Sequence, residues 1–342
     1  MNFIELEKSY WDLKLLLKLS RDIVPTNLDN EKKTFLFHKV QGKIYNPVFT
    51  YAQNENAVSI SELERLKNQF SLLNEKFSQE YIELITKDIA WINGFGQRTK
   101  IGFNNFLSDL FGKPSEDLLQ KSHDILMNYK KYPEIEKCIS SEDALHLFSN
   151  ELKNKGFNNW TVSIENSAAG VTVESLKQNI KIKSDFYFSK ITIDRLFVHE
   201  IGTHVRRSEN GKKQDSLLYR YGFPNYIETE EGFAIYNEEC YGMLSEFDKL
   251  RYALRVVACN KTFEMDFYSL QSFLSIYLSE SEAFDMAARV KRGFVNTDSL
   301  GGYTKDKIYL SGYYIVKKLG QLELNKLMIG KIGVKQLQLE NK

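Results

Sequence analysis

One segment of the chain contains residues whose types and spacing are suited to binding a metal ion and hydrolysing a bond. It is the hexapeptide HEIGTH, which begins at His199 and ends at His204. Two neutral imidazoles are good zinc ligands, and the carboxylate of Glu200 can take a proton from metal-bound water. In the common HExxH pattern the histidines are four residues apart and share one helix face. Here they are five apart, about 140° around a regular helix, so both cannot reach one ion.

This wider spacing leaves two interpretations open. In the first, a one-residue π-bulge widens the helix and returns His204 to the face of His199. Gly202 lies between them and, as a poor helix former, makes such a distortion easier. In the second, the cluster arises by chance and the two histidines contact different partners. The spacing alone does not decide between them.

A hydrolytic zinc site also needs a third protein ligand and an open position for water. An acidic run from Glu228 to Glu231 begins a predicted helix about two dozen residues after His204. The next helix could therefore deliver a carboxylate to the metal. Acidic residues also favour the positive end of a helix, and this is the role that we predict for Glu228 and Glu230.

The elements that must position these residues are mostly helices. Short alternating segments rich in β-branched residues predict two or three strands at Trp160–Ile164, Val171–Glu174 and Ile180–Lys183. Helical patterns cover Asn2–Arg21, Ile60–Trp91, Glu116–Lys130, Thr192–Arg207, Glu230–Leu244, Arg251–Asn260 and Tyr268–Lys291. The predicted fold class is α+β: mainly helical, with a small β-sheet directly before the helix that carries the histidines.

The length of 342 residues fits one large domain or two closely packed ones. Only five prolines occur and no low-complexity linker is evident. We predict a mainly helical N-terminal region over 1–150, packed against a catalytic core over 151–342, with both forming one unit.

Composition narrows the classes of partner. Lys and Arg number 46 against 45 Asp and Glu, which argues against a protein built to neutralise nucleic-acid phosphates or anionic membranes. Three cysteines without CxxC spacing predict neither a disulfide framework nor a thiolate metal site. No segment approaches the roughly 18 to 20 apolar residues of a membrane span, and the N-terminus lacks a signal-peptide core. We therefore expect a cytoplasmic protein without nucleic-acid or membrane partners; its oligomeric state is not specified.

The pairing of HEIGTH with Glu231-Gly232-Phe233-Ala234 resembles the tyrosine/phenylalanine carboxypeptidase family. That family includes the microtubule-associated tyrosine carboxypeptidases, and its bacterial members carry a Gln-Glu-Gly-Leu-Ala motif. Further resembling segments are Asn46–Tyr51, Leu110–Pro114, Leu196–Gly211, Arg289–Gly293 and Thr304–Gly312. This chain departs from the motif in having Glu230 in place of the Gln and Phe233 in place of the Leu.

The resemblance implies a zinc metallopeptidase fold and an enzyme that removes a C-terminal aromatic residue from a peptide or protein. It implies one Zn²⁺ per chain, with His199, His204 and Glu231 as ligands and Glu200 as the general base. The extra carboxylate of Glu230 leaves open whether it competes with Glu231 for the metal.

Other residues are candidates for supporting roles. Tyr309 could donate a hydrogen bond to the developing oxyanion, or could be a buried tyrosine with a satisfied hydroxyl. A carboxypeptidase must also bind a free carboxylate, for which a guanidinium is well shaped. Arg289, Arg292 and Lys305 are the candidates; each could instead be a surface or ion-paired residue. Arg206 and Arg207 follow the histidine helix directly, and we predict structural roles for both.

Three hypotheses of function follow. The first is a zinc carboxypeptidase that prefers C-terminal Tyr or Phe. The second keeps the metal but changes the bond cleaved, as in an aminopeptidase or dipeptidyl peptidase, and predicts a carboxylate that binds the substrate's amine. The third is a non-catalytic regulatory or binding protein on a metallopeptidase scaffold, against which the intact Glu200 argues.

Overall fold

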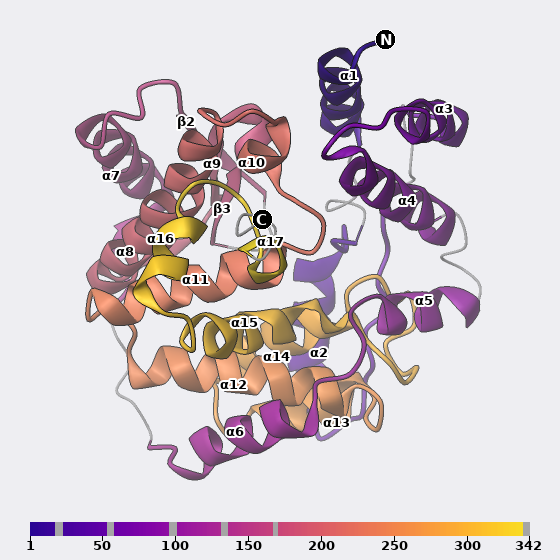
Figure 1. The fold of residues 1–342 in the computed structure, drawn as a ribbon. Coiled ribbons are helices and arrows are strands. Elements are labelled where there is room, and N and C mark those ends of the chain that lie inside the picture. Colours follow the sequence, from indigo (N-terminus) through magenta and orange to yellow (C-terminus); the bar gives the residue numbers. More distant parts are fainter. Residues whose placement is uncertain (18–22, 53–57, 96–100, 131–135, 167–169, 338–342) are drawn as a thin grey trace.

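Helices make up most of the protein, and a small sheet lies to one side, next to α7 (Figure 1). The structure, a computed structural model, describes residues 1–17, 23–52, 58–95, 101–130, 136–166 and 170–337. The helices before the sheet are α1 (Phe3–Leu16), α2 (Leu28–Val40), α3 (Ile60–Ser71), α4 (Ser78–Phe95), α5 (Ile101–Phe111), α6 (Glu116–Met127) and α7 (Ser141–Asn154). Among the described helices, none combines the length and apolarity needed to cross a bilayer.

The sheet has the strand order β2-β4-β3, formed by β2 (Thr161–Glu165), β3 (Val171–Glu174) and β4 (Asn179–Lys183). Strand β4 pairs in parallel with β2 and antiparallel with β3, with a one-turn 3₁₀ helix, Ser175–Lys177, between β3 and β4. A separate antiparallel pair joins β1 (Ile139–Ser140) to β5 (Tyr187–Phe188). The predicted strand segments and the α+β class are therefore confirmed.

The sheet supports the helix that carries the histidines. Ile180 and Ile182 of β4 are fully buried and belong to the same apolar cluster as Phe148 of α7. Ile201 and Val205, from the histidine segment, complete this cluster. One face of the histidine helix is thus fixed against the sheet, and the other is left free to present polar side chains.

After the sheet the chain is helical almost to its end. The elements are α8 (Lys190–Leu196), the π-helix η2 (Phe197–Val205), α9 (Arg206–Gly211), α10 (Leu217–Tyr221), α11 (Ile227–Cys240), α12 (Glu246–Lys261), α13 (Phe267–Leu274), α14 (Glu280–Lys291), the 3₁₀ helix η3 (Thr304–Lys307), α15 (Ile308–Val316), α16 (Gln321–Leu327) and α17 (Val334–Leu337). Figure 1 shows α11, α15 and α12 one below another across the molecule, with α7 on one side and α1, α3 and α4 on the other.

Two glycines bring α11 and α15 unusually close together. A Cβ added to Gly232 would lie 2.0 Å from the carbonyl carbon of Gly312, and a Cβ on Gly312 would lie 1.9 Å from the carbonyl oxygen of Glu228. Only hydrogen at both positions allows this approach. Glu231 directly precedes Gly232 on α11, and Tyr309 lies on α15. The contact between the two helices therefore fixes the position of Glu231 relative to Tyr309.

Two predicted helices are each divided in the structure. The segment predicted as one helix over Ile60–Trp91 is α3 and α4, which fold back on each other so that Phe70 stacks on Tyr81 at 4.6 Å. The segment over Tyr268–Lys291 is α13 and α14, because Ser279 forms a capping box with Glu282 and starts a new helix. The N-terminal pattern over Asn2–Arg21 becomes α1, ending at Leu16; residues 18–21 lie outside the described part.

Apolar clusters cross the boundary between the two predicted parts. Leu6 and Tyr10 of α1 share one buried cluster with Phe233 of α11 and Leu327 of α16. Residues from both ends of the chain therefore build the same core. The division into 1–150 and 151–342 remains a prediction.

Candidate metal centre

Both histidines lie on the π-helix η2, which continues directly from α8 and into α9. The widened turn is visible in its hydrogen bonds, because the backbone N–H of Arg206 donates to the carbonyl of Ile201, five residues earlier. Thr203 adds a bond from its hydroxyl to the carbonyl of Val198, 3.1 Å away and also five residues back. In a π-turn, residues five apart share a face. The π-bulge interpretation of the wide histidine spacing is therefore confirmed.

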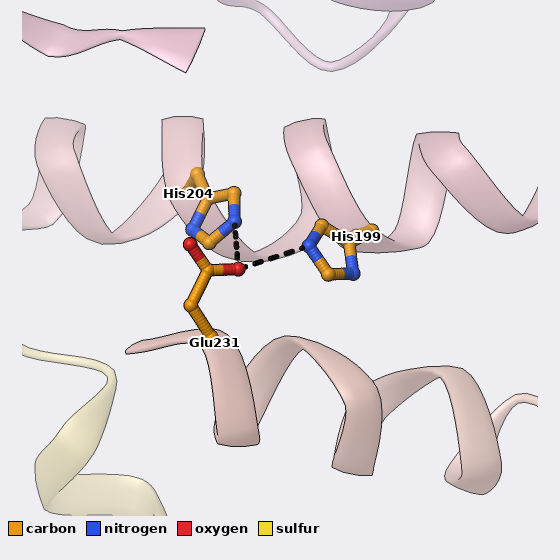
Figure 2. A group of neighbouring side chains, drawn as sticks. All are labelled: His199, His204 and Glu231. Carbon is orange, nitrogen blue, oxygen red and sulfur yellow. Dashed lines mark ion pairs between the residues drawn. The ribbon is translucent and has the colours of Figure 1, made fainter. Parts of the chain in front are cut away.

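Helix α11 brings a carboxylate to these two rings (Figure 2). The Oε2 of Glu231 lies 3.5 Å from the Nε2 of His199 and 3.8 Å from the Nε2 of His204. One ligand atom from each of the three residues lies within 4.8 Å of the others. Both histidines are buried, with exposed fractions of 6% and 7%.

The three residues fit a zinc ion. With bonds of about 2.0 to 2.1 Å in tetrahedral geometry, neighbouring ligand atoms lie about 3.4 Å apart. The two measured nitrogen–oxygen distances are close to this value, so small side-chain adjustments would suffice to bind an ion. Two imidazoles and one carboxylate also leave a position for water, as hydrolytic zinc sites require.

A second carboxylate orients each histidine by a hydrogen bond at Nδ1, the ring nitrogen that does not face Glu231. Glu238 accepts from the Nδ1 of His199 at 2.6 Å, and Glu230 accepts from the Nδ1 of His204 at 2.8 Å. Because a carboxylate can only accept, Nδ1 carries a proton in both rings, and Nε2 is the nitrogen that faces Glu231. Burial opposes charge on His199, but Glu231 and Glu238 outweigh it and raise its pKa to about 10. The pocket therefore favours a positive charge between these groups.

Removing the carboxylate behind His199 is expected to weaken metal binding. Glu238→Gln should lower zinc affinity about 10- to 100-fold, because partners of this kind fix the ring and raise its basicity. Competition with a chromophoric chelator measures the affinity. Glu239→Gln is the matched control, since Glu239 follows on the same helix but pairs with Lys317. Equal zinc affinities for the two variants would show that the bond from Glu238 has no such role.

The structure separates Glu230 from Glu231. Glu230 is buried and forms ion pairs with Arg207 and with Lys331, the latter at 2.9 Å. Burial alone would raise its pKa, but these two cations outweigh burial and hold the pKa well below its usual range. Its carboxylate is on the Nδ1 side of His204, away from the nitrogen that faces Glu231. Glu230 lies in the first turn of α11, as predicted, and it also accepts a hydrogen bond from His204.

Arg207 has the structural role that was predicted for it. Its guanidinium is fully buried and donates to the carbonyls of Leu327 and Ile332 as well as to Glu230. It therefore ties the end of the histidine helix to the C-terminal segment.

Glu200 faces a cavity of about 300 Å³ that also reaches His199 and Tyr309. Its carboxylate forms no hydrogen bond or ion pair with any residue that the structure describes. Burial raises its pKa, which suits a carboxylate that must accept a proton nearer neutral pH. The candidate base is therefore free, next to a ligand and open to the cavity.

The lining of the cavity is rich in arginine. The arginines that line it are Arg195, Arg251, Arg255, Arg289 and Arg292. Arg289 and Arg292 both donate to the buried carboxylate of Asp306, at 2.7 to 3.1 Å. These two candidates are thus brought to the cavity, although each already has a partner.

The remaining two candidates lie near Glu231. The ammonium of Lys305 interacts electrostatically with Glu231, and burial lowers its pKa, but it is not among the residues lining the cavity. Tyr309 does line the cavity; burial and the nearby Glu231 carboxylate raise its pKa. Its hydroxyl makes no hydrogen bond with the described residues. The alternative, a buried tyrosine whose hydroxyl is hydrogen-bonded within the protein, is therefore not observed among them.

Two functional candidates had not been predicted from the sequence, Glu238 and Arg255. Glu238 lies seven residues after Glu231, two turns further along one face of α11, and this spacing could have identified it. Arg255 lies on α12, far from either motif, and reaches the cavity only through the packing of α12 beside α15 and η3. No local pattern indicates it.

Comparison with known proteins identifies related chains. A family model described as "Microtubule-associated tyrosine carboxypeptidase" matches residues 34–341. The chain is 25% identical to "Microtubule-associated tyrosine carboxypeptidase 1" of Mus musculus over 293 residues, covering 84% of this chain and 54% of that relative. It is 24% identical to the Rattus norvegicus protein of the same name over 293 residues, with the same coverage of 84% and 54%. The chain therefore spans about half the length of these relatives.

Proposed function

The chain belongs to the microtubule-associated tyrosine carboxypeptidase family, and on that premise we propose that it is a zinc-dependent carboxypeptidase that removes a C-terminal tyrosine or phenylalanine from peptides or proteins. The observation that carries the proposal is the placement of His199, His204 and Glu231 around one point, with the unbonded Glu200 beside them in a cavity. A purely structural metal site has no use for such a base.

In this proposal His199, His204 and Glu231 hold the ion. Bound there, zinc would supply a Lewis acid that polarises the scissile carbonyl and acidifies a water molecule. Glu200 accepts the proton of the attacking water and returns it to the leaving amine. Tyr309 donates a hydrogen bond to the developing oxyanion, for which its hydroxyl is available.

The rest of the cavity supports a C-terminal aromatic substrate. Apolar and aromatic side chains line part of it, among them Leu28, Phe186 and Phe188, and can surround an aromatic ring. We propose that Arg289, Arg292 and Lys305 contribute positive charge that attracts the terminal carboxylate. A zinc aminopeptidase or dipeptidyl peptidase is the alternative. The cavity is also lined by Glu200, Asp248 and Asp285, but its five arginines outnumber these carboxylates and disfavour the amine that such enzymes must bind.

Mass spectrometry of the products tests the proposal. The zinc-loaded protein is incubated with peptides ending in Tyr, Phe, Leu or Glu and otherwise identical. We expect loss of one C-terminal residue, faster for Tyr and Phe than for Leu or Glu. Release of N-terminal residues or dipeptides would favour the alternative, and no cleavage of any peptide would support a non-catalytic role.

A further inference from the structure

Arg255 is one of two arginines of the cavity, with Arg251, that have no anionic partner among the described residues. It forms no hydrogen bond or ion pair with any residue that the structure describes, and its buried Nε is unsatisfied. Arg195 pairs with Glu238, and Arg289 and Arg292 pair with Asp306. Arg251, one turn before Arg255, pairs with none of the described acidic residues either, but it is exposed, whereas Arg255 is half-buried.

Two tyrosines hold the Arg255 side chain in place. Its guanidinium carbon lies 4.8 Å from the centre of the Tyr309 ring and 5.2 Å from that of Tyr252. These two rings are stacked on each other, 5.9 Å apart and within 15° of parallel. Stacking on aromatic faces orients a guanidinium and leaves its N–H groups free to bind in their plane.

The charged groups around Arg255 have a net positive charge, which favours binding of an anion. Asp306 faces three guanidinium groups, since Arg255 interacts with it electrostatically although only Arg289 and Arg292 bond to it. Around this single carboxylate the local charge therefore stays positive. A half-buried guanidinium with an unsatisfied donor is costly unless a ligand completes it.

We propose that Arg255 binds the free α-carboxylate of the substrate's C-terminal residue through a two-pronged ion pair. This inference rests on the proposed carboxypeptidase function and assigns the contact that restricts cleavage to the last peptide bond. Tyr309 lies between the proposed carboxylate-binding residue and the metal centre, because its ring contacts Arg255 and its hydroxyl interacts electrostatically with Glu231. A residue whose carboxylate sits on Arg255 has its peptide bond directed toward the metal centre and Glu200.

The test compares two peptides that differ only at the terminus, one ending in tyrosine with a free carboxylate and the other in tyrosine amide. The zinc-loaded wild-type protein is expected to cleave the free acid much faster. Arg255→Gln should lower kcat/KM for the free acid about 100-fold, mostly through KM, and lower kcat/KM for the amide far less, so that the preference for the acid is lost. Arg255→Lys keeps the charge without the fork and should give a smaller loss.

Arg220→Gln is the matched control. Arg220 also stacks on a tyrosine, 5.0 Å from the ring of Tyr221, and also has an unsatisfied buried Nε, but it lies on α10 and does not line the cavity. It should keep the wild-type preference for the free acid. Equal losses on acid and amide in the Arg255 variants, or an unchanged preference, would overturn the assignment while the proposed function stands. If the wild type removes no C-terminal residue, both fail.

Discussion

Replacing Glu200 with glutamine is expected to reduce kcat for removal of a C-terminal aromatic residue by about 10²- to 10⁴-fold, the usual contribution of a general base. Glutamine has nearly the same shape but cannot accept the proton of the attacking water. Because Glu200 bonds to none of the described residues, the change leaves the neighbouring side chains in place. Zinc content and unfolding midpoint should therefore match the wild type, and steady-state kinetics on a peptide ending in tyrosine measures the loss.

The control for this variant is Glu209→Gln. Glu209 lies on α9 and accepts from the indole N–H of Trp160 at 2.9 Å, outside the cavity. It loses a charge of the same kind and should keep full activity. An active Glu200→Gln protein would mean that another group takes the proton, and loss of zinc from it would mean that Glu200 itself helps to hold the ion.

The second large effect is expected at the crossing of α11 and α15. Gly232→Ala places a methyl group 2.0 Å from the backbone of Gly312, so the two helices must separate. Overpacking of a backbone contact of this kind should lower the free energy of unfolding by about 3 kcal/mol. Since Glu231 directly precedes Gly232, the shift should also weaken zinc binding. Denaturant unfolding and a chelator competition measure the two effects.

Gly202→Ala is the comparison for this variant. Gly202 also lies inside a helix, but a Cβ there meets only the carbonyl oxygen of Phe197, at an ordinary 3.5 Å. Alanine should therefore change stability by no more than about 1 kcal/mol, in the stabilising direction. If Gly232→Ala unfolds at the same denaturant concentration as Gly202→Ala, the close crossing is not what positions Glu231.

The metal centre shows how far sequence reasoning reaches. Residue types and spacing indicated the two histidines and the base, and offered a π-bulge as one of two interpretations, because hydrogen bonding within one helix is a local property. The choice of Glu231 over Glu230 as the third ligand could not be made from the local sequence pattern. Resemblance to a family indicated it, and the structure gives the physical basis: Glu230 is engaged by Arg207 and Lys331, whereas Glu231 faces both Nε2 atoms.

The prediction of one helix over 60–91 was wrong for a physical reason. A continuous apolar period over 60–91 fits one helix as well as it fits two helices that pack on each other, so periodicity could not find the turn at 72–77. Arg289 and Arg292 were proposed because they share a helix face; that both pair with Asp306 of η3 could not be predicted from their spacing. Arg255 was missed because its significance lies in lacking a partner, which only the packed structure reveals.

The central claim is that the π-helix lets His199 and His204 bind one ion together with Glu231. Anomalous diffraction at the zinc edge from crystals of the zinc-loaded protein tests it most directly. The account predicts a single strong peak per chain, about 2.0 to 2.2 Å from the Nε2 atoms of both histidines and from a carboxylate oxygen of Glu231. A peak that contacts only one of the histidines, or that lies outside this triangle, would contradict it.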